Sequence, residues 1–157
     1  MALHQQPLRI RTAVLEDSAQ IAELSVVLGY PVSASTMHER LKRLLSRSEE
    51  LILVAELASS IVGWVHGSEQ ELLESGRRCE ILGLVVDPLH RGKGIARQLV
   101  TQLETWAASR GLDHIAVRSN VLRVESHPFY ERLGYVRSKT QHAYLKQLYP
   151  GSSSASI

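Results

Sequence analysis

Residues 91–96, Arg-Gly-Lys-Gly-Ile-Ala, join an apolar run at 81–86 to an amphipathic stretch at 95–109. This order predicts a strand, a glycine turn and the start of a helix. Gly92 and Gly94 place no side chain between the backbone and a ligand. Successive N–H groups at the positive end of the helix can therefore surround an anion, and the segment predicts a phosphate site.

Three basic side chains, Arg91, Lys93 and Arg97, add positive charge to the same turn, which suits a ligand with several phosphates. Two common phosphate motifs do not fit. A Walker loop needs Ser or Thr after its lysine, but Gly94 follows Lys93, and Arg97 occupies the third glycine position of a dinucleotide fingerprint. A glycine turn that binds nothing stays open as the alternative on this segment alone.

The overall composition is that of an ordinary globular chain. Its 157 residues are 44% hydrophobic and 22% charged, which is enough to bury one core. We predict one domain over residues 1–149 and a flexible Ser-rich tail over 150–157. The net charge of +2, with one Phe and two Trp, argues against nucleic acid and against a membrane surface as partners.

Cysteine usage and the first residues indicate the compartment. Cys79 is the only cysteine, so the chain can form no internal disulfide and has no companions for a structural metal site. A lone thiol beside a strand indicates packing more than a nucleophile. The first eleven residues lack the apolar core of a signal peptide, so we expect the cytoplasm, with no bound metal.

Hydrophobic periodicity predicts a mixed order of elements. Alternating or β-branched runs predict strands at 8–11, 51–57, 61–66, 80–86 and 114–119, with a strand pair or one bent strand over 135–148. Helical spacing predicts helices at 15–28, 36–47, 95–110 and 125–133. The second of these is expected to begin at a capping box from Thr36 to Glu39.

Two motifs in this order resemble those of the GNAT superfamily of N-acetyltransferases. Arg91, Gly94 and Ala96 match its pyrophosphate loop, (Gln/Arg)-x-x-Gly-x-(Gly/Ala), and Val-Val-Asp-Pro at 85–88 precedes the loop at the superfamily spacing. Residues 129–135, Phe-Tyr-Glu-Arg-Leu-Gly-Tyr, are similar to its late helix-to-strand signature. The resemblance covers residues 8–148.

The resemblance implies an α/β (α+β) fold with a mixed central sheet, mostly antiparallel with a splayed parallel pair, flanked by four helices. It implies acetyl-CoA as co-substrate and direct attack by a primary amine in a ternary complex. The acceptor is a small molecule or a protein amine, and a homodimer is a candidate assembly. The alternative is an acyl-CoA-binding sensor or pseudoenzyme of the same fold.

The resemblance also implies the cofactor contacts. The backbone of Leu84, Val85 and Val86 would pair with the pantetheine arm, and Gly83 suits a bulge that splays the sheet there. The pyrophosphate would be held by Arg91, Gly92, Lys93, Gly94, Ile95, Ala96 and Arg97. Many superfamily members carry an Asn at the position of Arg123, where it contacts the cofactor arm. This chain departs from that pattern, because its Asn120 lies three residues earlier. We therefore expect Asn120 and Arg123 to make the contact.

Two residues are candidates for the chemistry. Glu80 resembles a catalytic Glu of histone-acetylating members and would act as general base, through a water relay. The alternative is a strand-end ion pair of Glu80 with Arg77 or Arg78. Tyr130 matches the tyrosine near the cofactor sulfur and would act as general acid, and a packing tyrosine is the alternative.

The acceptor pocket is expected from the first half of the chain, where residues 28–32 join two helices. Acidic residues in a predicted loop at 69–74 would attract a cationic amine. Solvated loop carboxylates are the alternative. His127 could be a base or a structural helix-start residue, and His66 and His142 carry no specific prediction.

Overall fold

The computed structural model describes residues 7–119 and 126–149. The chain forms two compact units, Met1–Arg118 and Ser119–Ile157. The first contains β1 (Arg9–Thr12), η1 (Leu15–Asp17), α1 (Ser18–Val27), α2 (Ala34–Leu45), β2 (Glu50–Leu57), β3 (Ser60–Leu72), β4 (Gly76–Val86), η2 (Pro88–His90), α3 (Ile95–Ser109) and β5 (Ile115–Val117). The second contains α4 (Ser126–Arg132). The expected tail at 150–157 lies outside the described residues, and the single domain over 1–149 stays a prediction.

The five strands form one sheet in the order β1-β2-β3-β4-β5. The first four are antiparallel to their neighbours, and β5 is parallel to β4. The parallel pairing covers only Cys79 to Ile81 of β4. The predicted mixed sheet, mostly antiparallel with a splayed parallel pair, is confirmed, and the described residues contain the four predicted helices, three of them in the first unit and α4 in the second.

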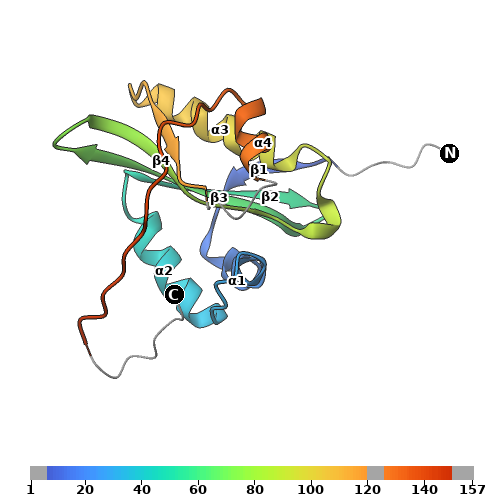
Figure 1. The fold of residues 1–157 in the computed structure, drawn as a ribbon. Helices are drawn as coiled ribbons and strands as arrows, with labels where there is room; N and C mark the ends of the chain where they lie inside the picture. The colour runs from blue at the N-terminus through green and yellow to red at the C-terminus, as the bar shows by residue number, and fades with distance from the viewer. Residues whose placement is uncertain (1–6, 120–125, 150–157) are drawn as a thin grey trace. The chain divides into compact units, whose positions relative to one another are not determined.

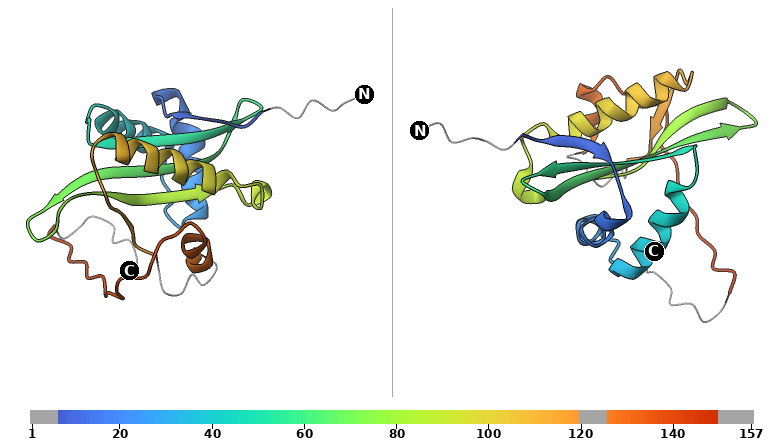
Figure 2. Two further views of the ribbon diagram at one scale, coloured as in Figure 1. Left: turned by 90° about the horizontal axis from the view of Figure 1, so that it is seen from above. Right: turned by 180° about the vertical axis from the view of Figure 1, so that it is seen from behind.

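Helices cover both faces of this sheet. In Figure 1, α1 and α2 lie on one face and α3 lies on the other, and the rear view in Figure 2 agrees. The face of α3 repeats an apolar residue every four positions, at Ile95, Leu99, Leu103 and Ala107, and all four are buried. A Cβ atom at Gly67 of β3 would overlap Leu103, so this glycine lets helix and sheet approach closely.

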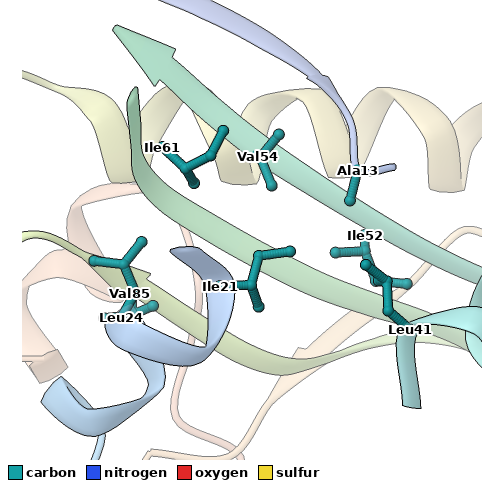
Figure 3. Packing of buried hydrophobic residues seen from close by; sticks show 8 residues of the cluster. All are labelled: Ala13, Ile21, Leu24, Leu41, Ile52, Val54, Ile61 and Val85. Atoms are coloured by element: carbon teal, nitrogen blue, oxygen red, sulfur yellow. The ribbon is translucent and has the colours of Figure 1, made fainter. Parts of the chain in front are cut away.

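The core beneath α1 and α2 joins side chains that are far apart in sequence. Figure 3 shows its eight buried members, which are Ala13, Ile21, Leu24, Leu41, Ile52, Val54, Ile61 and Val85. Burial of a side chain such as Leu41 or Val54 contributes about 1.5–3 kcal/mol. This cluster fixes the first two helices on the sheet face that carries the site described below.

The sequence predicted most helix boundaries correctly, and one of the predicted helix starts was wrong. Helix α3 ends before Gly111, which has a φ of +77°. The capping box predicted from Thr36 to Glu39 is wrong, because the N-cap of α2 is Ser33, whose hydroxyl accepts a hydrogen bond from Thr36 N at 3.1 Å. Both positions offer a hydroxyl cap to the same apolar pattern, and the earlier one adds a turn to the helix.

The β3–β4 hairpin is longer than predicted. The strands continue to Leu72 and from Gly76, so most of the expected loop at 69–74 is strand. The strand pair extends past β2, whose pairing with β3 ends at Ser68, and Figure 2 shows the projecting hairpin. One carboxylate stabilises this extension, since Glu69 on β3 forms ion pairs with Arg77 on β4 and with Arg110 at the end of α3.

The second unit confirms a short helix near the predicted place. Gly134, with a φ of +92°, follows α4, and Tyr135 N donates to Tyr130 O at 3.0 Å. The strand or strand pair predicted over 135–148 is wrong, because these residues have no strand assignment. An alternating sequence forms a strand only when a neighbouring strand accepts its hydrogen bonds. No helix among residues 7–119 and 126–149 has the length and apolar character to cross a membrane.

Candidate functional site

The glycine turn opens α3 with free backbone donors. Gly92 and Gly94 adopt φ values of +79° and +77°, and Gly94 is the N-cap of the helix. The first hydrogen bond of α3 runs from Gln98 N to Gly94 O at 3.1 Å, so the amides of residues 95–97 have no acceptor within the helix. Arg91, Lys93 and Arg97 are exposed beside them. The turn has the geometry of an anion site.

The strand before this turn has a free edge. Beyond Ile81, β4 has no strand partner on the β5 side among the described residues. The register with β3 passes from Gly67↔Ile81 to His66↔Gly83, so Leu82 is the extra residue of a bulge. The bulge that the sequence analysis expected at Gly83 is present, with the neighbouring Leu82 as its extra residue. Leu84, Val85 and Val86 therefore lie on a strand edge that another extended chain could pair with.

Glu80 lies on β4 just before this open edge, where β4 still pairs with β5. Its side chain is 5% exposed, and Arg118 Nε lies 3.3 Å from Oε1 while Arg78 Nη2 lies 4.0 Å from Oε2. The predicted alternative of an ion pair with Arg78 is present, and Arg118 is a partner that the sequence did not indicate. The carboxylate is therefore buried with both oxygens facing guanidinium groups.

A polar cluster that the sequence did not predict lies on the same sheet face. Glu50 Oε2 accepts a hydrogen bond from His66 Nε2 at 2.8 Å, and Glu50 Oε1 accepts one from Ser68 Oγ at 3.1 Å. The strands align Glu50 with Ser68 and Ser68 with Glu80. The signal in the sequence is the pair of polar residues at alternate positions 66 and 68 within a mostly buried strand.

A pocket opens on the same sheet face, and Trp64, two residues before His66 on β3, is part of its lining. It has a volume of about 270 Å³, and its lining comes from α1, α2, their connection, β3 and β4. The lining residues are Ser25, Leu28, Tyr30, Val32, Met37, Arg40, Trp64, Leu82 and Gly83. The Trp64 indole N–H is buried without a hydrogen-bond partner among the described residues. The expected contribution of residues 28–32 to a pocket is thus present in the structure.

The acidic residues expected to attract a cationic amine do not line this pocket. Its one charged lining residue is Arg40. Two guanidinium groups, from Arg77 and Arg110, hold the pKa of Glu69 below its ordinary value. The carboxylate of Glu69 therefore pairs with one arginine of the β3–β4 hairpin and with one at the end of α3, where it stabilises the fold.

Cys79 behaves as a packing residue. It is fully buried on β4. Burial raises the pKa of its thiol to about 11, so the thiol stays protonated near neutral pH. This state is unsuited to a nucleophile and agrees with the packing role.

The remaining predicted residues lie in the second unit or outside the described residues. Tyr130 lies in α4, where its ring contacts Phe129 and Tyr135 edge to face at 5.1 Å and 5.7 Å between centroids. His127 lies in the first turn of the same helix. Asn120 and Arg123 lie outside the described residues, so their expected contact with the cofactor stays a prediction.

No group of three or more His, Cys, Asp or Glu side chains suited to a metal ion occurs in the described part of the chain.

Comparison with known proteins identifies relatives of this chain. Over 97 residues the chain is 36% identical to acetyltransferase SG1711 of Sodalis glossinidius, a match that covers 60% of this chain and 63% of that protein. The chain thus spans less than two thirds of that relative.

Solved structures of similar fold cover more of the chain. The aminoglycoside 6'-N-acetyltransferase AAC(6')-Ih from Acinetobacter baumannii matches 91% of this chain and 100% of its own, with a TM-score of 0.79 and 20% identity. Aminoglycoside N-acetyltransferase AAC(6')-Iy in complex with CoA matches 94% and 99%, with a TM-score of 0.83 and 18% identity. At these identities the likeness concerns the fold.

A family model decides the relationship. The model described as "Acetyltransferase (GNAT) family" matches residues 17–135, which include the glycine turn, the open edge of β4 and α4. The match confirms the resemblance carried by the two sequence motifs. By this match, which spans its mixed sheet and its glycine turn, the chain belongs to the GNAT acetyltransferase family.

Proposed function

We propose that this protein transfers an acetyl group from acetyl-CoA to a primary amine by direct attack in a ternary complex. The observation that carries the proposal is the junction of β4 and α3. An edge at residues 84–86, without a strand partner on the β5 side in the described part of the chain, leads through η2 to a turn whose amides have no helical acceptor. An extended arm ending in phosphates, which is the shape of CoA, matches both features.

Different residues of this junction bind different parts of the cofactor. The backbone of Leu84, Val85 and Val86 pairs with the pantetheine arm as an added strand would. The amides of the turn from Gly92 to Arg97 hold the pyrophosphate, with Arg91 and Lys93 supplying charge. When bound, acetyl-CoA supplies the activated thioester.

Tyr130 is the proposed partner of the leaving thiolate. A phenol with a reference pKa near 10 and a thiol near 8.5 differ by about 1.5 units, so a hydrogen bond supplies much of what full proton transfer would. The position of Tyr130 in the family signature supports this role.

Glu80 is proposed to assist removal of the amine proton through a water relay. Its oxygens already face Arg118 and Arg78, so an amine has no free approach to them. A water molecule can reach such a site and pass the proton on. The nearby polar cluster of Glu50, His66 and Ser68 lies in register with Glu80 and offers the relay a continuation.

The pocket lining supports a class of acceptor. Apolar side chains such as Met37, Trp64 and Leu82 form most of its wall, and Arg40 gives it a positive charge. We propose an acceptor amine on a partly apolar molecule that also carries an anionic group. A polycation such as an aminoglycoside lacks a carboxylate partner among the lining residues.

One assay tests the reaction and the acceptor class together. Acetyl-CoA consumption should be measured with amino acids, short peptides, polyamines and aminoglycosides, with product mass as the second readout. Apolar amino acids or peptides should be acetylated faster than polyamines and aminoglycosides. Tight binding of acetyl-CoA without transfer to any amine would favour the sensor or pseudoenzyme instead.

Arg40→Gln then tests the anionic group of the acceptor. The variant should raise KM for carboxylate-bearing acceptors by about 10-fold and leave KM for the matching amides unchanged. An equal change for both would contradict the proposed contact. Arg43→Gln, another exposed basic position on α2, is the matched control.

A further inference from the structure

We propose that His66 is the proton acceptor for the attacking amine and that Glu50 is its positioning residue. The inference rests on the proposed acetyl transfer and makes His66, in place of Glu80, the first group to receive the amine proton. It is carried by the hydrogen-bonded cluster of Glu50, His66 and Ser68 beside the pocket.

The cluster fixes the histidine in one orientation. Both oxygens of Glu50 are used, one by His66 Nε2 at 2.8 Å and one by Ser68 Oγ at 3.1 Å. The side chain of Glu50 is 13% exposed and that of His66 is 19% exposed. A carboxylate only accepts hydrogen bonds, so Nε2 carries the proton in the neutral ring and Nδ1 has the free lone pair.

The free nitrogen is available to a ligand. Nδ1 of His66 has no hydrogen-bond partner among the described residues, and it is not one of their buried unpaired atoms. The ring therefore combines a fixed donor side with an accessible acceptor side. A histidine that serves only to pair with buried polar groups does not need an accessible nitrogen with a free lone pair.

The position on the sheet brings His66 next to the pocket. His66 and Trp64 lie two residues apart on β3 and so share a face, and His66 is opposite Gly83 on β4. Trp64 and Gly83 both line the pocket. The bulge at Leu82 opens β4 at the same level. In strand register, His66 therefore lies between the pocket residues Trp64 and Gly83 and the aligned pair of Ser68 and Glu80.

The chemistry favours an imidazole over a carboxylate. A lysine-like ammonium has a reference pKa about four units above imidazole and about six units above a carboxylate. Proton transfer to imidazole is therefore about 100-fold less unfavourable. Charged groups on this face include Glu50 on β2, Glu80 on β4 with Arg78 and Arg118, Arg40 on α2, and the ion-paired group of Arg11, Asp17 and Glu56. Glu50 is the one that contacts the ring, and it stabilises the imidazolium.

The step balances as follows. The ammonium gives one proton to Nδ1 of His66, directly or through one water, and the lone pair of the resulting neutral amine attacks the thioester carbonyl. The carbon–sulfur bond then breaks, and the departing thiolate takes a proton from the general acid. The second proton of the attacking nitrogen leaves as the amide forms and restores the general acid. The imidazolium returns its proton to solvent after the amide product leaves.

His66→Gln is the decisive variant, because the glutamine amide can still donate to Glu50 but cannot accept a proton. We expect kcat with the best acceptor of the panel to fall about 100-fold at pH 7. The loss should shrink as pH rises toward the pKa of the amine, since the neutral amine needs no base. Acetyl-CoA affinity, measured by calorimetry, should stay unchanged and report that the fold is intact.

His114→Gln is the matched control. His114 Nδ1 also lies 2.8 Å from a carboxylate, Asp113 Oδ1, but its side chain is 80% exposed. This variant should keep the parent activity. For the positioning role, Glu50→Gln should lower kcat about 10-fold, and the double variant should be no slower than His66→Gln alone.

Three results separate the possible failures. An unchanged kcat for His66→Gln, or a loss that is equal at all pH values, would overturn the role of His66. A pH-dependent loss in Glu80→Gln without one in His66→Gln would assign the base to Glu80. No transfer by the parent protein to any amine would overturn the proposed function itself.

Discussion

Gly83 lies directly against the indole ring of Trp64. A Cβ atom at position 83 would come within 2.8 Å of Cζ3 and 2.9 Å of Cη2 of that ring. Real Cβ atoms do not approach other atoms so closely, so any larger residue must displace the indole. Since both residues line the pocket, this contact couples the bulge of β4 to the shape of the proposed acceptor site.

Gly83→Ala should therefore disturb both stability and acceptor binding. We expect the free energy of unfolding to fall by about 1–3 kcal/mol, measured by urea denaturation, because a partly buried ring has to move. KM for the acceptor should rise. Adding Trp64→Phe removes the two clashing ring atoms, so the double variant should be more stable than the sum of the single effects predicts. Simple additivity would contradict the contact.

Gly94→Val should abolish binding of acetyl-CoA. A side chain at the N-cap of α3 would stand between the ligand and the free amides, and we expect calorimetry to show affinity at least about 100-fold weaker. Gly111→Val is the control, since both glycines have a φ of +77° and neither faces an atom within 4 Å. Both variants carry the same backbone strain. Equal binding by the two would refute the anion site.

Tyr130→Phe should lower turnover by about 10-fold to 1,000-fold with little change in cofactor affinity. The substitution removes the hydroxyl and keeps the ring that packs on Phe129 and Tyr135. The rate must be measured under conditions in which chemistry limits it. Tyr144→Phe is the control, because Tyr144 is 93% exposed. An unchanged kcat would remove Tyr130 from the mechanism.

Asp17→Asn should destabilise the fold near neutral pH. Both oxygens of Asp17 accept hydrogen bonds from Arg11, at 2.8 Å and 2.9 Å, and the side chain is 7% exposed. Loss of this charge leaves Glu56 as the acidic partner of Arg11 among the described residues. We expect a loss of about 2–4 kcal/mol in urea denaturation at pH 7.

The same variant carries a pH test. Burial opposes ionisation of Asp17, but the hydrogen bonds from Arg11 and from the Val14 amide outweigh it and lower the pKa. A lowered pKa in the folded state stabilises the protein above the unfolded value near 3.8, and the effect disappears as pH falls through the folded value. The difference between parent and variant should therefore shrink below about pH 4. A constant difference would contradict the ion pair.

The features that the sequence determined by itself are those in which neighbouring residues supply the whole signal. The four-residue apolar repeat and its flanking glycines define α3 from Ile95 to Ser109. The turn that opens α3 depends on two glycines within three positions, and the family motif lies in the same short segment. The β2–β3 hairpin likewise closes through Ala58 and Ser59, with φ values of +52° and +65°.

Only the tertiary structure decided which side chains meet across the strands. Glu50 contacts His66 and Ser68 from 16 and 18 positions away. Arg118, which directly follows β5, reaches Glu80 on β4 although α3 separates the two strands in sequence. These contacts depend on strand register, and the bulge at Leu82 shifts that register by one residue. One residue changes the face to which a side chain points, so no local pattern could have specified the cluster beside the pocket.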